Sequence, residues 1–148
     1  MATQQSSASD EAQLRQLIAQ WTQALYAKDL NTLMSYYAPD ILTFDFLPPL
    51  QYHGVEAYRK NFAAWFAAVQ GPIEYETRDL RILTGEEVAF CHSLTRVRST
   101  STSGKHTATW VRVTVGFRKL EGTWRITHEH VSVPCDMKTS HALVDLQP

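Results

Sequence analysis

The stretch 108–136 constrains the fold of this chain more than any other part of it. It holds two long runs of β-branched and aromatic residues, and the dipeptide Glu121-Gly122 separates them as a short turn. Strands that follow each other through so short a connection pair in antiparallel fashion. The second run carries the tripeptide His-Glu-His at 128–130 before Pro134 ends it. The sequence therefore predicts an antiparallel sheet in the C-terminal half, with chemically versatile side chains on its last strand.

Three helices and one strand are predicted ahead of that sheet. Apolar residues recur at helical spacing over 11–28 and 55–69, which predicts two helices. Asp10 is placed to cap the first of them. Asp29 is placed to cap a shorter helix that lies between the two. The segment 41–46 alternates as a strand. The remaining strands are expected at about 73–83, 87–99, 107–119 and 123–133. The predicted class is α+β: a cone-shaped, curved and mostly antiparallel sheet, covered by three N-terminal helices, with a cavity beneath them.

Length and composition indicate one domain. The chain has 148 residues and a formal net charge of −1, which gives no reason to expect binding to nucleic acid or to an anionic membrane. The domain is expected over 10–136, between a disordered tail at 1–9 and a C-terminal tail at 137–148. No apolar run could span a bilayer and the N-terminus lacks the pattern of a secretory signal, so a cytoplasmic location is expected. The two cysteines, Cys91 and Cys135, are expected to be free thiols.

Four segments carry a family resemblance: ALYAKDL, YAPDILTFDF, YHG and GTWRITHEHVSV. Their order over about 11–136 resembles the nuclear transport factor 2-like superfamily. That group includes ketosteroid isomerase, scytalone dehydratase, polyketide (SnoaL-like) cyclases and the association domain of calcium/calmodulin-dependent kinase II, which the C-terminal strand resembles most. The resemblance implies a ligand-sized cavity, but its members include enzymes, binding proteins and assembly modules.

Asp45 is the first candidate catalytic residue. The resemblance aligns it with the general base of ketosteroid isomerase, and burial in an apolar cavity would raise the pKa of its carboxyl toward neutrality. The alternative is an Asp that makes a turn or a hydrogen bond near Pro48-Pro49. The same alignment puts Trp21 and Val115 where the isomerase has the two donors of its oxyanion hole, so steroid isomerase activity is not expected.

His92 is the second candidate. It shares a strand face with Phe90, Leu94 and Arg96, and the family pattern makes that face the cavity side. A pair formed by His92 and Asp45 would move protons next to a carbonyl group. The alternative is a histidine that is hydrogen-bonded within a mixed core. Arg96 is a candidate contact for an acidic ligand, with a solvated arginine as its alternative.

The last strand gives two conflicting indications. Its apolar residues Trp124 and Ile126 share alternation with His128 and His130, which places the histidines inside. The family pattern instead places Thr127, Glu129 and Val131 in the cavity and the histidines against a partner subunit. We adopt the family pattern, which makes Glu129 a second cavity carboxyl; the alternative is a surface ion pair with Arg112 or Arg125. Two histidines could also begin a metal site, but no third ligand has a matching spacing.

Two functions are compatible with these residues. The first is a ketosteroid-isomerase-like pocket that acts as a cofactor-free isomerase, dehydratase or cyclase through Asp45 and His92. Its ligand would be an apolar or ring-bearing small molecule, acidic if Arg96 contacts it, lying against the aromatic residues Trp21, Phe62 and Trp65. The second is a noncatalytic ligand-binding or assembly module. We expect no cofactor, no resident metal, and a homodimer through an outer sheet face that exposes Trp110, Trp124 and Ile126.

Overall fold

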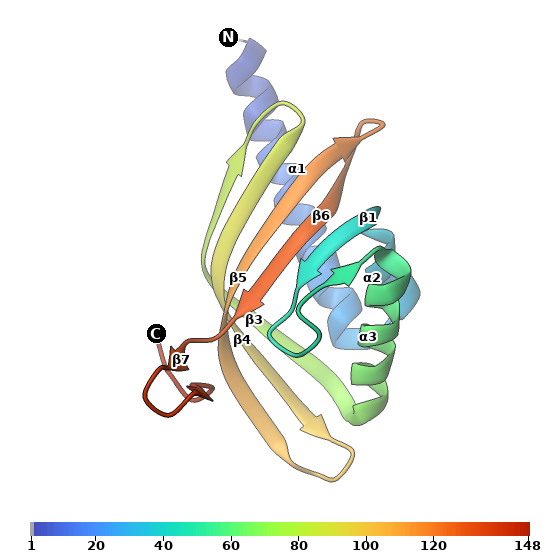
Figure 1. Cartoon of the computed structure of the whole chain (residues 1–148). Coiled ribbons are helices and arrows are strands. Elements are labelled where there is room, and N and C mark those ends of the chain that lie inside the picture. Colours follow the sequence, from blue (N-terminus) through green and yellow to red (C-terminus); the bar gives the residue numbers. More distant parts are fainter. Residues whose placement is uncertain (1) are drawn as a thin grey trace.

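A six-stranded curved sheet forms the centre of the molecule, and three helices lie against its inner face (Figure 1). The computed structural model describes residues 2–148, with side chains from residue 8 onward. The order of the strands is β2-β1-β6-β5-β4-β3, and all neighbours are antiparallel except β1 and β6, which run parallel. The elements are α1 (Ala2–Ala27), α2 (Leu30–Ser35), β1 (Tyr37–Phe44), β2 (Tyr52–His53), α3 (Val55–Ala68), β3 (Val69–Thr84), β4 (Val88–Ser101), β5 (His106–Leu120), β6 (Thr123–Ser132), β7 (Cys135–Asp136) and β8 (His141–Ala142). The expected α+β class, curved sheet and three N-terminal helices are confirmed.

Three boundaries differ from the sequence prediction. Helix α1 begins at Ala2, so residues 2–9 continue the first helix where a disordered tail was expected; Met1 lies outside the described residues. Strand β1 runs over Tyr37–Phe44, whereas this strand was expected over 41–46. The expected C-terminal tail, 137–148, holds strand β8, which pairs with β7 just ahead of it. Asp29 does cap α2, because its carboxylate accepts the backbone N–H of Thr32.

Asp10 lies inside α1 and fastens this helix to β5 and β6 beside the turn that joins them, instead of capping the helix. Its Oδ1 accepts hydrogen bonds from Lys119 Nζ at 2.8 Å and from the indole N–H of Trp124 at 3.1 Å. Asp10 is only 4% exposed, and the hydrogen bond from Lys119 is the main reason that the pKa of its carboxyl is lowered. A buried carboxylate needs such partners, so this cluster fixes how α1 lies across the sheet.

The core lies between the helices and the inner face of the sheet. Each helix contributes one stripe of its surface to this core, as its apolar spacing predicted. Strands β4 and β5 contribute alternate residues, as expected for a sheet with one covered face. The buried core residues include Leu14, Trp21, Leu25, Leu33, Met34, Tyr58, Phe62, Ile73, Val111, Val113, Phe117, Trp124 and Ile126.

Strand β3 forms one edge of the sheet and is irregular at two places. Its pairing with β4 shifts register between Gln70 and Glu74, around Gly71-Pro72, and again between Arg78 and Arg81. The second shift contains Asp79, whose φ is 54°. Extra residues of this kind bend a strand and interrupt its ladder.

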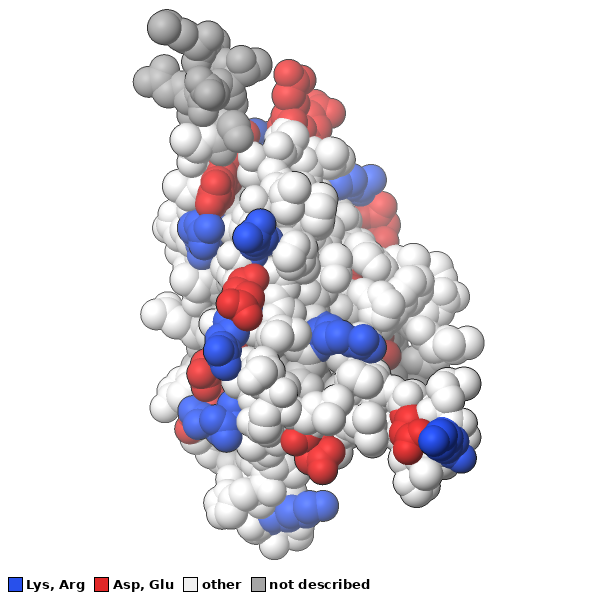
Figure 2. Space-filling model, turned by 90° about the vertical axis from the view of Figure 1, so that its left-hand side faces the viewer, with Lys and Arg blue, Asp and Glu red and all other residues white. Residues whose placement is uncertain are grey.

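The surface carries both charge signs together. Figure 2 shows Lys and Arg side chains interleaved with Asp and Glu side chains over one face of the molecule. Within the described residues, no helix combines the length and apolar character that a membrane crossing needs. Cys91 is buried and Cys135 is exposed, and both are free thiols as expected. The cytoplasmic location stays a prediction.

Candidate functional site

The candidate site is a cavity of about 420 Å³ that opens between α3, the end of β1 and the inner face of the sheet. This volume suits a small ring-bearing molecule. Its polar side chains include Asp45, Tyr58, Asn61 and Glu129. Most of the remaining wall is aromatic or aliphatic and comes from α1, α3 and strands β3 to β6. The cavity is therefore mainly apolar, with a few polar groups that can orient a ligand.

Glu129 lies in the wall of this cavity and is held by two tyrosines. Its Oε1 accepts the hydroxyl of Tyr37 and its Oε2 that of Tyr58, each at 2.9 Å. The indole N–H of Trp21 in turn donates to the Tyr37 hydroxyl at 2.9 Å. The carboxyl is only 6% exposed. A chain of hydrogen bonds thus connects helix α1, strand β1, strand β6 and helix α3 at one point.

Burial is the main cause of the raised pKa of the Glu129 carboxyl. Desolvation raises the pKa of its carboxyl from 4.5 to about 7, the two tyrosine hydroxyls lower it, and the charge of Asp45 raises it. Because burial disfavours the ionised form, the group is close to half-protonated at neutral pH. Desolvation also raises the pKa of the Tyr37 and Tyr58 hydroxyls well above 10, so both remain donors. The arrangement provides one carboxyl that can give or take a proton in the neutral range.

Asp45 follows the end of β1 and also lines the cavity. Its Oδ1 accepts the backbone N–H of Phe46 at 2.8 Å, and its Oδ2 accepts the side-chain amide of Asn61 at 3.1 Å. Desolvation raises the pKa of its carboxyl, while these hydrogen bonds lower it. Asp45 therefore makes the local turn contact and also faces the cavity, and its role as a base stays a prediction.

The predicted aromatic contacts and Val131 come together at this cavity. Trp21, Phe62, Trp65 and Val131 all line it. Trp21 stands edge-on to Phe62, with ring centroids 6.5 Å apart, and edge-on to Tyr75 at 5.1 Å. Val115 instead lines a separate void of about 40 Å³, which is too small for more than a water-sized group.

The placement of His92 and Arg96 in the cavity is wrong. The inner face of β4 carries Cys91, Thr95 and the residues in phase with them, whereas His92 is exposed and points from the outer face. Arg96 shares the outer face of the sheet and pairs in register with Trp110. Neither side chain lines the cavity. Because His92 and Arg96 both lie on the outer face of β4, neither an Asp45–His92 pair nor a contact of Arg96 with a ligand in the cavity can form.

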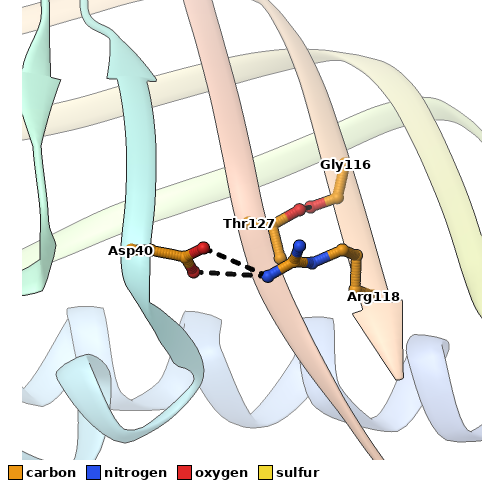
Figure 3. A network of polar contacts seen from close by, with 4 residues as sticks. All are labelled: Asp40, Gly116, Arg118 and Thr127. Atoms are coloured by element: carbon orange, nitrogen blue, oxygen red, sulfur yellow. Dashed lines mark hydrogen bonds and ion pairs between the residues drawn. The ribbon is translucent and has the colours of Figure 1, made fainter. Parts of the chain in front are cut away.

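A β-bulge resolves the conflict over the last strand. Gly116 of β5 pairs with His128, but its neighbour Phe117 pairs with Ile126, so Thr127 is an extra residue in β6. Figure 3 shows this place, where the Thr127 hydroxyl donates to the carbonyl of Gly116 at 3.3 Å. The extra residue reverses the alternation. Ile126 before it and Glu129 after it therefore both face inward.

The two histidines that flank Glu129 lie on the outer face. Nδ1 of His128 lies 2.8 Å from the carbonyl oxygen of Leu42, and the ring of Phe44 stands edge-on to both histidines. No group of three or more potential metal ligands occurs among the described side chains. The histidines thus support the pairing of β1 with β6.

The patch that was expected to drive dimerisation does not exist as described. Trp124 and Ile126 are each only 3% exposed and belong to the core, because the bulge turns them inward. Trp110 is partly covered by Arg78, whose guanidinium lies 5.7 Å from the ring centroid. The homodimer stays a prediction, but these residues do not support it.

Three site residues were not predicted from the sequence: Tyr37, Tyr58 and Asn61. Tyr58 lies in the third predicted helix, and Tyr37 lies just ahead of the strand predicted at 41–46. The available signal was chemical: a buried tyrosine hydroxyl and a buried carboxyl both need partners, and they satisfy each other here. Thr43 is also fully buried, pairs in register with Glu129, and has an Oγ1 without a partner among the described residues.

Comparisons with known proteins agree with this architecture. An NTF2-like protein of unknown function from Pseudomonas putida KT2440 is 34% identical and superposes with a TM-score of 0.88, over 96% of this chain and 99% of that chain. A protein from Novosphingobium aromaticivorans DSM 12444 that is considered to be a scytalone dehydratase gives 13% identity and a TM-score of 0.79, over 87% of each chain.

One from Xanthomonas campestris, considered to be a calcium/calmodulin dependent protein kinase II association domain, gives 18% identity and a TM-score of 0.73, over 90% of this chain and 87% of that one. The Novosphingobium and Xanthomonas likenesses show a shared fold. No curated protein matches this chain. The family model described as "SnoaL-like domain" matches residues 14–136. The chain therefore belongs to the SnoaL-like family of the nuclear transport factor 2-like fold.

Proposed function

We propose that this protein binds a ring-bearing small molecule in its cavity and catalyses a proton transfer on it without a cofactor, as an isomerase, dehydratase or cyclase. One observation carries this proposal: two carboxyl groups with raised pKa values, Asp45 and Glu129, face the same apolar cavity. Enzymes that move protons at neutral pH use acids and bases that are shifted in this direction. Glu129 replaces His92 as the partner of Asp45 in this scheme.

The two carboxyls differ in a way that suits two roles. Asp45 lies among the cavity-lining residues that follow β1, and it would accept a proton from a carbon next to a carbonyl group. The electron pair left behind forms an enol or enolate. Glu129, with a pKa of about 7, would return a proton either to another carbon, which is an isomerisation, or to a leaving hydroxyl, which is a dehydration. General acid–base catalysis of this kind contributes about 10²–10⁴-fold.

Exchange of hydrogen for deuterium tests the chemical step before the substrate is known. Cyclic ketones and β-hydroxy ketones are incubated with the protein in D2O, and proton NMR follows the loss of the signal next to the carbonyl. We expect exchange by the wild type and by Asp145→Asn, which makes the same change at an exposed site. Asp45→Asn should abolish it. Equal exchange by Asp45→Asn and wild type would remove Asp45 from the mechanism.

A noncatalytic ligand-binding or assembly module is the second candidate. It is supported by the fold shared with the Xanthomonas protein considered to be a kinase association domain. The two candidates separate in the exchange assay, because a module that only binds or assembles would shift its melting temperature with ligand but exchange no proton.

A further inference from the structure

The charged side chains that line the cavity are all acidic. Asp45 and Glu129 are its acidic residues, and the described residues that line it include no lysine, arginine or histidine. None of the ion pairs found among the described side chains involves either carboxyl; those pairs use Asp10, Glu11, Asp40, Glu56 and Glu74. The protein thus supplies one buried and one half-buried carboxyl and leaves both without a cation.

Aromatic rings form much of the rest of the wall. Trp21, Tyr58, Phe62, Trp65 and Tyr75 all line the cavity. Phe62 lies at the centre of this group, with ring centroids 4.8 Å from Tyr58 and 6.1 Å from Trp65. The faces of aromatic rings attract cations, and several rings around one space are the arrangement that binds alkylated ammonium groups.

We propose that the natural ligand of this cavity is a positively charged compound, a ring-bearing amine or quaternary ammonium, whose cation lies among the aromatic rings and between Asp45 and Glu129. The proposal rests on the proposed function in that it names the substrate class for the same cavity. It replaces the acidic ligand that was considered from the sequence, because Arg96 lies on the other side of the sheet.

Electrostatics favour a cation over a neutral or an acidic ligand. The charge of Asp45 already disfavours ionisation of Glu129, and burial disfavours the ionisation of both. A cation between them offsets the desolvation and the mutual repulsion together, whereas an anion adds a third like charge. A neutral ligand leaves both effects in place. The ligand's charge is therefore the variable to which this cavity should respond most.

The affinity for a cation should also increase with pH. Glu129 loses its proton near pH 7, and the ionised form attracts a cation more strongly. The other titratable groups around it stay protonated through that range, because burial raises the pKa values of all of them and that of Cys91 reaches about 12. These neighbours are Tyr37 of β1, Tyr58 of α3, Tyr75 of β3 and Cys91 of β4. Asp45 is the charged neighbour of Glu129.

Benzyltrimethylammonium is a suitable probe because its charge does not depend on pH. Its matched controls are neopentylbenzene, which has the same shape without the charge, and the anion 3-phenylpropionate. NMR titration of the full chain at about pH 8 should give at least about tenfold tighter binding for the cation than for either control, and the cation should bind several-fold more weakly at about pH 6. Equal or tighter binding of neopentylbenzene or of the anion would overturn the proposal, as would absence of cation binding.

Three variants assign the effect to residues. Glu129→Gln should remove the pH dependence of cation binding, while Asp145→Asn should leave it unchanged. Trp65→Leu keeps both carboxyls and should lower the affinity for the cation at least about threefold more than the affinity for neopentylbenzene, which provides a second test if Glu129→Gln does not fold. Unaltered pH dependence in folded Glu129→Gln, or an equal loss for both probes in Trp65→Leu, would contradict the proposed site.

The result separates this inference from the proposed function. Exchange of neutral ketones that depends on Asp45, together with equal binding of the cation and its carbon isostere, would refute the charged ligand and leave proton-transfer catalysis standing. Selective cation binding without exchange of any carbonyl compound would refute proton-transfer catalysis and leave the charged ligand standing.

Discussion

Replacement of Glu129 by glutamine should change how the stability of this protein depends on pH. The carboxyl is 6% exposed, and its pKa in the folded protein is about 7 against an ordinary value of 4.5. The folded state therefore holds a proton on Glu129 over a range in which the unfolded chain has released it. Stability from this group is complete below about pH 4.5 and is lost as the pH rises through about 7.

The size of the effect follows from the difference between the two pKa values. Each tenfold change in proton affinity corresponds to ~1.4 kcal/mol, so ionisation of Glu129 should cost the folded state about 3 kcal/mol at pH values above the folded pKa. Solvent screening reduces this little, because both oxygens are buried and held by Tyr37 and Tyr58. The glutamine keeps the shape and one acceptor oxygen but cannot ionise.

Urea unfolding from about pH 5 to 8 measures the effect. The quantity of interest is the unfolding free energy of the wild type minus that of Glu129→Gln at each pH. Other groups, including Asp45, are present in both proteins and cancel in this difference to first order. We expect the difference to become less favourable to the wild type by about 2–3 kcal/mol across the range.

Parallel pH profiles for the two proteins would refute the reasoning. That outcome would mean that the folded-state pKa of Glu129 is ordinary. The apolar cavity would then fail to desolvate this carboxyl, and the proton-transfer role proposed for it would lose its physical basis.

Three further outcomes are expected. His92→Ala should leave both ligand affinity and deuterium exchange at wild-type levels, since His92 lies on the outer face of the sheet; a loss of exchange would restore it to the site. Asp10→Ala should lower the urea unfolding free energy by roughly 1–3 kcal/mol, because Lys119 and the buried Trp124 indole lose their shared acceptor. Gly54→Ala should cost about 1–2 kcal/mol, seen as a lower melting temperature, because Gly54 has φ 81°, where a side chain is strained; an unchanged melting temperature would argue against that backbone conformation.

The elements of this fold could be predicted from periodicity because most of them obey a single rule along their length. The alternation of β5 and the apolar stripe of α3 are examples, and both carry buried residues where the pattern placed them. The Asp29 cap also followed from residue type alone. These features depend on local chemistry, which a sequence records directly.

The phase of a strand proved harder to predict than its existence. On β4 the large residue Phe90 faces outward and is 45% exposed, while the smaller Ala89 and Cys91 face the core. The large side chains of the helices fill the space under the curved sheet, so small residues fit there. A large apolar side chain usually faces the core, but on β4 the larger side chain faces outward. His92 was placed in the cavity because of the family pattern, and the observed phase of β4 contradicts that placement.

The bulge at Thr127 explains why two sound arguments disagreed. Hydrophobicity correctly placed Ile126 inward, and the family pattern correctly placed Glu129 inward, but strict alternation allowed only one of them. The extra residue is visible only in the pairing between β5 and β6. Long-range hydrogen bonds such as those from Tyr37 and Tyr58 to Glu129 are equally invisible to periodicity, since they join residues 92 and 71 positions apart.

The irregular edge strand β3 bears on how this protein behaves at high concentration. A long, flat edge would offer an unbroken row of free backbone groups to a second molecule, which is the usual start of fibrous aggregates. Here Gly71-Pro72 and the left-handed Asp79 divide that row into short lengths, and charged side chains such as Glu76 and Arg78 stand between them. The chain should consequently remain dispersed even when crowded, and straightening the strand by deletion of Asp79 should make it form amyloid-like deposits.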